Sequence, residues 1–173
     1  VHEVARDLGV LVMHSVSETS SLSANPKVRT PLGFRCARQG IHDAIVGGAY
    51  AAQVAKAKNL KRWMTVSPDY AYGRDTTNEF IEYLKFFNPS VEVIGDVWPK
   101  LFQADYTESV TRLLQGKPQA IYSALWGGDL TSFIDQASIY GLFKDREFFA
   151  VNMADYAVLT AVKNVPNGLH SGN

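Results

Sequence analysis

The chain has 173 residues, of which 46% are hydrophobic and 20% charged, with 17 basic and 17 acidic side chains. This composition is typical of a globular protein, and the balanced charge argues against a surface for nucleic acid or acidic membranes. No apolar run approaches the roughly 18 residues that a membrane span requires. The single cysteine, Cys36, allows no internal disulfide, and no histidine pair has metal-ligand spacing, so no metal site is expected.

The first predicted elements are the end of a helix over residues 1–8, stopped by Gly9, and a strand over residues 10–14. A serine-rich loop, residues 15–25, follows the strand directly. It is either a linker or a binding loop at the carboxyl end of the strand. An extended segment at Phe34-Arg35 then leads to an alanine-rich helix over residues 41–58, in which Gly47-Gly48 indicates close backbone packing.

From residue 63 onward, strands and helices alternate. Apolar runs predict strands over residues 63–66, 91–97, 120–125 and 148–152, and a last strand after residues 166–168. Helical spacing predicts helices over residues 76–87, 108–115, 130–140 and 156–162. Such alternation implies parallel pairing. The predicted fold class is therefore α/β, with a doubly wound, mostly parallel sheet, helices on both faces and a flavodoxin-like topology.

Aromatic side chains follow the carboxyl ends of three predicted strands. They are Tyr70 and Tyr72, Trp126, and Tyr156. Any one of them alone is as well explained by core packing. Because open parallel sheets bind ligands at this edge, aromatics at three such places favour a ligand cleft.

No catalytic or cofactor-binding signature stands out. A phosphate loop, a dinucleotide fingerprint and a nucleophile elbow are all missing, so neither an enzyme nor a cofactor is expected. His14, Ser17 and Glu18 are too crowded in one loop to form a triad. Gly127-Gly128-Asp129 is interpreted as a helix start capped by Asp129 rather than an anion site. Capping also accounts for the other acids near helix starts, which are Asp69, Asp75 and Asp155.

Several short motifs occur in an order that is informative as a set. They are Gly9-Val10-Leu11-Val12-Met13-His14-Ser15-Val16-Ser17-Glu18-Thr19, Phe34-Arg35, Asp69-Tyr70-Ala71-Tyr72-Gly73, Asp105-Tyr106-Thr107, Lys117-Pro118-Gln119-Ala120, and Gln136-Ala137 with Gly141-Leu142. In this order and spacing they resemble the type I periplasmic binding proteins. The likeness is to the branched-chain amino acid and amide receptors of ABC importers, and it covers nearly all of the chain.

The resemblance implies two lobes joined by hinge strands, with the ligand held between them. Residues 1–38 are expected to be the end of the first lobe and the hinge crossing, and residues 39–173 the second lobe. The chain would then be an internal piece of a longer receptor whose precursor carries a signal peptide. The implied location is periplasmic, or extracytoplasmic with a lipid anchor. The implied partners are a small-molecule ligand and a membrane permease, without nucleic acid and without direct membrane insertion.

The resemblance also implies ligand-binding residues in both lobes. In the first lobe, Ser17 and Thr19, with Ser15 beside them, match the small hydroxyl residues that grip the ligand's carboxylate and amino groups. In the second lobe, Tyr72 matches the family's tyrosine, with Tyr70 beside it. The aromatic that the family has after its fourth strand aligns with Trp126 or, as the alternative, Tyr122.

One expected ligand contact departs from the family. The acidic residue that pairs with an amino group in the amino-acid receptors falls at Asn152 here. An ammonium group buried without a counter-charge is costly. Asp155 or Glu18 would replace the missing acid, or the ligand would be an amide, a urea-like molecule or an aromatic carboxylate.

The predicted function is capture of a small solute for an ABC importer by hinge closure, with no reaction of its own. The solute would be an amino acid, an amide or a small aromatic or carboxylic acid. One alternative is a ligand-sensing module of the same fold coupled to a regulator or kinase. A flavodoxin-like enzyme is the other.

Overall fold

The computed structural model describes residues 1–163 and 165–172 and contains two parallel sheets. The smaller sheet pairs β1 (Val12–His14) with β2 (Gly33–Arg35), and α1 (His2–Leu8) and α2 (Ser21–Ala24) accompany it. The larger sheet has the strand order β4-β3-β5-β6-β7, and every neighbouring pair is parallel. Its strands are β3 (Arg62–Val66), β4 (Glu92–Val97), β5 (Ala120–Ser123), β6 (Glu147–Ala150) and β7 (Leu169–Ser171).

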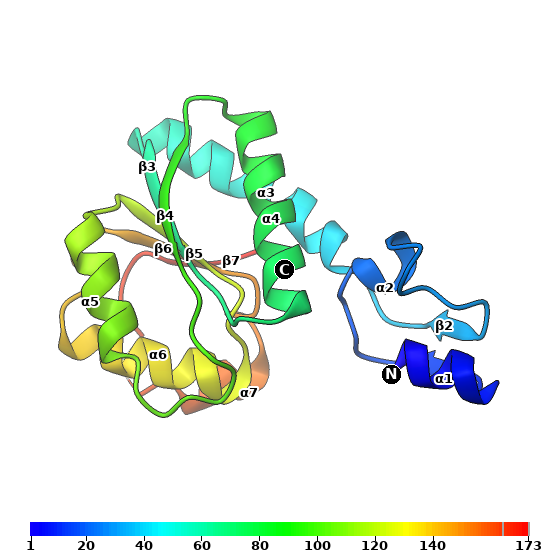
Figure 1. Cartoon of the computed structure of the whole chain (residues 1–173). Helices are drawn as coiled ribbons and strands as arrows, with labels where there is room; N and C mark the ends of the chain where they lie inside the picture. The colour runs from blue at the N-terminus through cyan, green and yellow to red at the C-terminus, as the bar shows by residue number, and fades with distance from the viewer. Residues whose placement is uncertain (164, 173) are drawn as a thin grey trace.

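Helices cover both faces of the larger sheet (Figure 1). One face carries α3 (Gly40–Lys58) and α4 (Ala71–Phe87), and the other carries α5 (Thr107–Gly116), α6 (Gly127–Ile139) and α7 (Tyr156–Ala161). Each face of the sheet packs its own hydrophobic core against these helices, and side chains within a strand alternate between the two cores. Trp63 packs with α3 and α4, whereas Met64 and Val66 pack with α5 and α6. A parallel sheet buried on both faces explains the continuous apolar runs. The predicted α/β class is confirmed.

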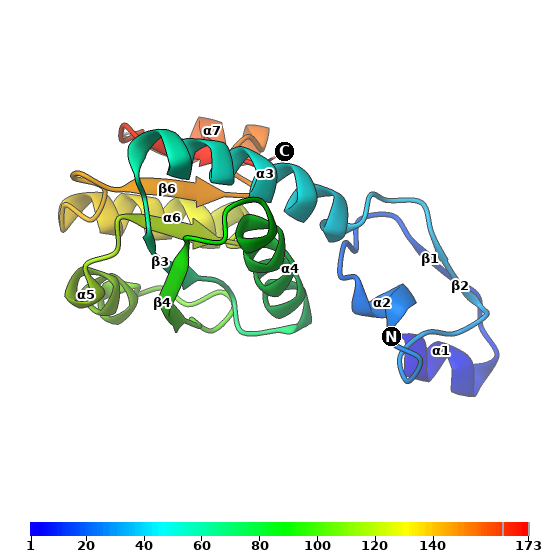
Figure 2. The same ribbon diagram turned by 90° about the horizontal axis from the view of Figure 1, so that it is seen from above.

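The smaller sheet lies beside the larger one (Figure 2). The serine-rich loop between β1 and α2 connects the two through its backbone. The Thr19 carbonyl accepts a hydrogen bond from Arg35 Nη2 at 2.7 Å, and the Glu18 carbonyl accepts one from the Gly40 amide at 2.9 Å. Asp75 on α4 accepts a hydrogen bond from the Ser21 amide at 3.0 Å. The loop is therefore held against the beginnings of α3 and α4.

Two helix starts and one short helix differ from the sequence-based expectation. α4 begins at Ala71 rather than at residue 76, and α6 begins at Gly127 rather than at residue 130. Apolar periodicity misses both first turns because they lie at the edge of the sheet, where polar residues are allowed. The short helix α2 inside the serine-rich loop was not predicted at all. Gly9 ends α1 in the left-handed conformation, as expected.

The predicted second lobe runs to Asn173, which lies outside the described residues. Among residues 1–163 and 165–172, no helix combines the length and the apolar character needed to cross a membrane.

Candidate functional site

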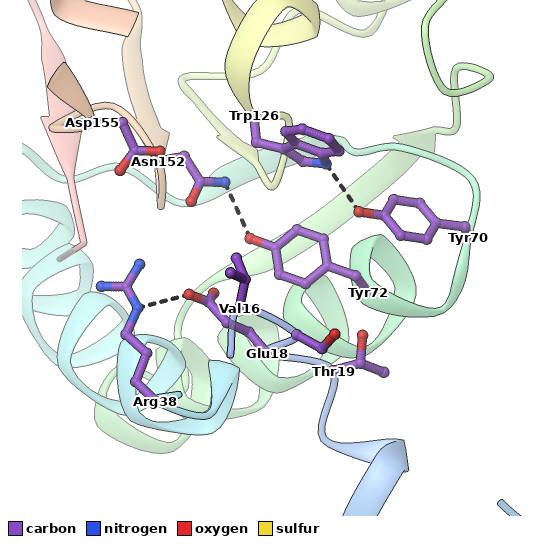
Figure 3. A pocket seen from close by; sticks show the side chains of 10 residues that line it. Val16, Glu18, Thr19, Arg38, Tyr70, Tyr72, Trp126, Asn152 and Asp155 are labelled. Atoms are coloured by element: carbon purple, nitrogen blue, oxygen red, sulfur yellow. Dashed lines mark hydrogen bonds and ion pairs between the residues drawn. The ribbon is translucent and has the colours of Figure 1, made fainter. Parts of the chain in front are cut away.

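A cleft of about 450 Å³ opens between the serine-rich loop and the carboxyl ends of strands β3, β5 and β6. Residues 16–19 form one wall of this cleft. The opposite wall consists of Tyr70, Tyr72, Trp126, Asn152 and Asp155, and Arg38 lies beside Glu18 (Figure 3). Segments far apart in the sequence thus meet at one edge of the sheet, which is where open α/β sheets hold their ligands.

The aromatic wall is a connected unit. The rings of Tyr70 and Tyr72 lie 5.9 Å apart, and Trp126 Nε1 donates a hydrogen bond to the Tyr70 hydroxyl at 2.9 Å. Phe102 packs edge-on against Trp126 with ring centroids 5.8 Å apart, although it does not itself line the cleft. These contacts fix the ring orientations before any ligand arrives, which lowers the entropic cost of binding.

Tyr72 is positioned by both backbone and side-chain constraints. It lies in the first turn of α4, where a Cβ on the next residue, Gly73, would stand 2.0 Å from the Pro68 carbonyl oxygen. Only glycine allows the helix to begin this close to the end of β3. Asn152 Nδ2 donates to the Tyr72 hydroxyl at 3.1 Å and to the Leu125 carbonyl at 3.1 Å. Burial raises the pKa of Tyr72 well above its ordinary value, so the phenol is uncharged at neutral pH.

The charged side chains form a second connected group. Arg38 Nε lies 2.8 Å from Glu18 Oε1 and 3.3 Å from Asp43 Oδ2. Burial raises the pKa of Asp155, an effect that nearby Arg38 opposes and Glu18 reinforces. Burial likewise raises the pKa of Asp43. The site therefore concentrates acidic groups around a single guanidinium.

The structure brings together all of the predicted site residues except one. Ser17, Thr19, Tyr70, Tyr72, Trp126, Asn152 and Asp155 line the same cleft. Ser15 does not line it, because it stands exposed where the chain leaves β1, before the loop turns toward the sheet. The alternative Tyr122 is wrong as a cleft residue: it is buried and stacks on Phe80, with ring centroids 3.7 Å apart. Tyr156 also stays outside, with 83% of its surface exposed.

Arg38 is the functional candidate that the sequence analysis missed. It follows the carboxyl end of β2, as the serine-rich loop follows β1, so the pairing of these two strands brings both segments to one edge. That pairing was the signal that could have identified it. Val16 was also missed, because an apolar residue inside a polar loop carries no chemical signature.

The capping interpretation of the acidic residues is wrong. None of the helix starts at α4, α6 and α7 has a side-chain cap hydrogen bond. Asp69 instead pairs with Arg74 at 2.7 Å, and Asp129 accepts a hydrogen bond from the Phe102 amide at 2.9 Å. Asp69 thus pairs with a side chain of the helix that follows it, and Asp129 holds a loop, and neither caps backbone amides at a helix start.

The contacts of His14 and Glu18 do not form a catalytic triad. His14 Nδ1 lies 3.3 Å from Ser17 Oγ, but the other ring nitrogen faces His2, whereas the Glu18 carboxylate pairs with Arg38. Within the described ranges, no group of three or more histidine, cysteine or acidic residues could hold a metal ion. The arrangement is suited to holding a small molecule.

One comparison with known sequences matches nearly the whole chain. The sequence model described as periplasmic binding protein matches residues 1–170. No protein of curated function matches the chain in sequence.

Solved structures share the fold. A solute-binding protein of an ABC transporter from R. palustris, in complex with benzoate, has a TM-score of 0.68 at 20% identity over 86% of this chain. Another, from Rhodopseudomonas palustris BisB5 in complex with 3,4-dihydroxybenzoic acid, has a TM-score of 0.71 at 22% identity over 86% of this chain. A leucine-, isoleucine-, valine-, threonine- and alanine-binding protein from Brucella ovis, in a closed conformation, has a TM-score of 0.66 at 17% identity over 87%.

The chain spans only a part of these structures. It covers 38% of the benzoate complex, 39% of the dihydroxybenzoate complex and 37% of the Brucella protein. At identities this low, the likeness demonstrates the fold alone.

Proposed function

The chain belongs to the periplasmic binding protein family, and on that premise we propose that it is part of the substrate-binding component of an ABC importer. It captures a small solute and carries out no reaction of its own. One observation carries this proposal: a single cleft is lined by the serine-rich loop on one side and by the carboxyl ends of three strands on the other.

The proposed mechanism is hinge closure. We assign residues 1–38 to the end of the first lobe and the hinge crossing, and the rest of the chain to the second lobe. The backbone passes from β2 to α3 through residues 36–39, a short segment that can absorb a rotation. The ligand favours the closed arrangement only because it contacts both walls there, so its differential affinity sets the population of closed molecules.

The cleft suits a small solute with a flat body. Its three aromatic rings offer apolar faces, and the polar groups at Ser17, Thr19 and Asn152 fix orientation. Structures that share the fold include complexes with benzoate and 3,4-dihydroxybenzoic acid, and another is named for binding leucine, isoleucine, valine, threonine and alanine. These ligands are similar in size and are consistent with the proposal.

The partner and location follow from the family. We propose that the closed receptor docks on a membrane permease and that the protein works outside the cytoplasm. The benzoate-bound protein is about 2.3 times as long as this chain, since 86% of this chain covers 38% of it.

Calorimetry on the complete polypeptide that contains this chain tests the proposal. Amino acids, amides and small aromatic acids and amines are titrated separately. At least one of them is expected to bind one to one with a dissociation constant in the micromolar range or tighter, which corresponds to about −8 kcal/mol. Failure of every compound to bind would remove the receptor assignment.

A further inference from the structure

Phe102 has a backbone conformation that is unusual for its residue type. In the loop between β4 and α5 it adopts a φ of 60°, in the left-handed region that bulky side chains rarely occupy because Cβ crowds the following carbonyl oxygen. The other positive-φ residues besides glycine in the described ranges have ordinary explanations. Asn59 and Lys117 end α3 and α5, and aspartate, the residue type at Asp145, tolerates this region. Phe102 ends no helix, so its conformation is strained.

Side chains of α6, which the loop passes in Figure 1, hold the loop in place. The Phe102 amide donates a hydrogen bond at 2.9 Å to Oδ2 of Asp129, a buried carboxylate in the first turn of α6. Further along the loop, Gln136 accepts a hydrogen bond from the Tyr106 amide at 2.7 Å and donates one to the Ala104 carbonyl at 3.0 Å. The surroundings therefore fix the strained conformation, as is typical of ligand clamps and active sites.

The conformation places an exposed ring at the rim of the cleft. Phe102 packs edge-on against Trp126, with ring centroids 5.8 Å apart, and Trp126 lines the cleft. Even so, 71% of the surface of Phe102 is exposed. Burial in a core does not offset the strain, because apolar stabilisation is proportional to the area removed from water. The strain instead holds an apolar ring beside the ligand site.

Phe102 also continues a row of aromatic side chains. Trp126 Nε1 donates a hydrogen bond to the Tyr70 hydroxyl at 2.9 Å, and the Phe102 ring contacts Trp126. The cleft volume of about 450 Å³ lies within the range of about 300–1,000 Å³ that holds drug-sized ligands. A solute longer than one ring therefore fits, and one that lies along the aromatic row reaches Phe102.

We propose that Phe102 is a specificity-determining residue. Its ring extends the aromatic wall past Trp126 and contacts the outer part of a solute that carries a second ring or an apolar arm of similar length. The inference rests on the proposed function and specifies the class of ligand for that same cleft. Binding removes the exposed ring from water, so the affinity that Phe102 contributes depends on the length of the solute rather than on its polar head group.

Probes that differ only in length test the proposal on the complete polypeptide. Benzoate is compared with 4-phenylbenzoate, and benzamide with 4-phenylbenzamide, so that the head group stays fixed within each pair. In at least one pair the longer probe is expected to bind at least about tenfold more tightly, because its second ring buries further apolar surface. Equal or weaker binding of the longer probe in both pairs would overturn the inference, as would the absence of measurable binding by both longer probes.

Variants separate contact with the solute from support of Trp126. Phe102→Asn removes the ring but introduces a residue type that adopts the left-handed region readily. It is expected to weaken binding of the longer probe about three- to tenfold and to change binding of the shorter probe by less than about twofold. Its Tm is expected to be unchanged or higher, because the strain is relieved.

Two further variants serve as controls. Phe102→Tyr keeps the ring and is expected to retain the preference for the longer probe. Lys117→Asn is the matched control, because it introduces the same residue at an exposed position with a positive φ outside the cleft. It is expected to leave the affinities for both probes unchanged.

The outcomes distinguish this inference from the proposed function. Equal weakening of both probes by Phe102→Asn would show that Phe102 only supports Trp126 and would overturn the inference, as would an unchanged affinity for the longer probe. A lower Tm of this variant would contradict the strain at Phe102 and overturn it too. If a solute of the calorimetric screen binds but length brings no preference, the receptor assignment stands and the specificity falls. If no solute and no probe binds, both fall.

Discussion

At the scale of single residues, the cleft depends most on Tyr72. Its hydroxyl is held by Asn152 at 3.1 Å, its ring lies beside Tyr70, and its position in α4 is fixed by the close approach of Gly73 to Pro68. The proposed ligand contact at Tyr72 therefore depends on an environment that the fold builds.

Replacement of Tyr72 by alanine should weaken ligand binding. Loss of the ring face and the hydroxyl removes about 1–3 kcal/mol of interaction, or roughly five- to 150-fold in affinity. Calorimetry with the tightest-binding solute of the screen measures the change in affinity. Tyr140→Ala, which alters a half-exposed tyrosine outside the cleft, is the control. Equal affinities for the wild type and the Tyr72 variant would contradict the proposed location of the ligand.

A second residue, Glu147, should control stability away from the cleft. Its carboxylate lies 2.5 Å from Lys58 Nζ and 2.7 Å from His170 Nε2. Burial acts to raise the pKa of Glu147, but the hydrogen bonds from Lys58 and His170 outweigh it and leave the pKa below its ordinary value. A carboxyl with a lowered folded pKa stabilises the protein above its unfolded pKa, and this contribution is lost as the pH falls through the folded pKa.

Glu147→Gln should therefore destabilise the protein at pH 7 by about 1–2 kcal/mol, and the difference from the wild type should disappear under acid conditions. Chemical denaturation at a series of pH values measures both effects. Glu92→Gln, which changes an exposed residue on an outer strand, is the control. Its stability should stay within about 0.5 kcal/mol of the wild type at every pH. A loss of stability in the Glu147 variant that does not change with pH would show that the ion pairs are not its cause.

At the scale of elements, the pair of helices α3 and α4 depends on the absence of a side chain at Gly48. A Cβ there would stand 2.8 Å from the Tyr83 Cβ and 3.0 Å from the Leu84 amide nitrogen. Real Cβ atoms essentially never come within 2.8 Å of another heavy atom, and the Tyr83 Cβ is fixed to the α4 backbone, so the two helices would have to separate. The close packing expected from Gly47-Gly48 is confirmed by this geometry.

Gly48→Ala should therefore cost about 1–3 kcal/mol of stability by overpacking, which lowers Tm by several degrees. Gly128→Ala is a matched control within another helix, because a Cβ at that residue meets nothing within 4 Å. It should be neutral or stabilising by up to about 1 kcal/mol. Thermal unfolding followed by circular dichroism compares the two, and equal Tm values would contradict the packing argument.

The sequence was most informative where hydrophobic periodicity is strong. Strands β3, β5 and β6 were predicted because burial on both faces demands continuous apolar runs, and their carboxyl ends led to Tyr72 and Trp126. Periodicity does not register the first turns of α4 and α6, since those turns lie at the sheet edge. Arg38 reaches the cleft only because β1 pairs with β2, a contact between distant segments that no local pattern encodes.

The acidic residues illustrate the same limit. Their positions near helix starts suggested caps, a local explanation, but Asp75 and Asp129 accept hydrogen bonds from Ser21 and Phe102 in remote loops. Tertiary contacts decide which of several possible partners a carboxylate takes. The sequence identified the residues that face the cleft better than it identified the residues that hold them there.

At the scale of the whole molecule, the proposed hinge closure requires that the two walls of the cleft move relative to each other. The walls are joined by residues 36–39 and by a small number of hydrogen bonds around the serine-rich loop. In small-angle X-ray scattering of the complete polypeptide, saturation with a binding solute should reduce the radius of gyration, because closure brings the lobes together. A radius that does not change on saturation would argue against hinge closure while leaving binding intact.

The most direct measurement is a crystal structure of the complete polypeptide grown with its tightest-binding solute. The solute is predicted to lie within about 4 Å of Thr19 on one wall and of Tyr72 and Trp126 on the other, which is the separation of atoms in contact. A solute bound elsewhere, or touching only one of the two walls, would contradict it.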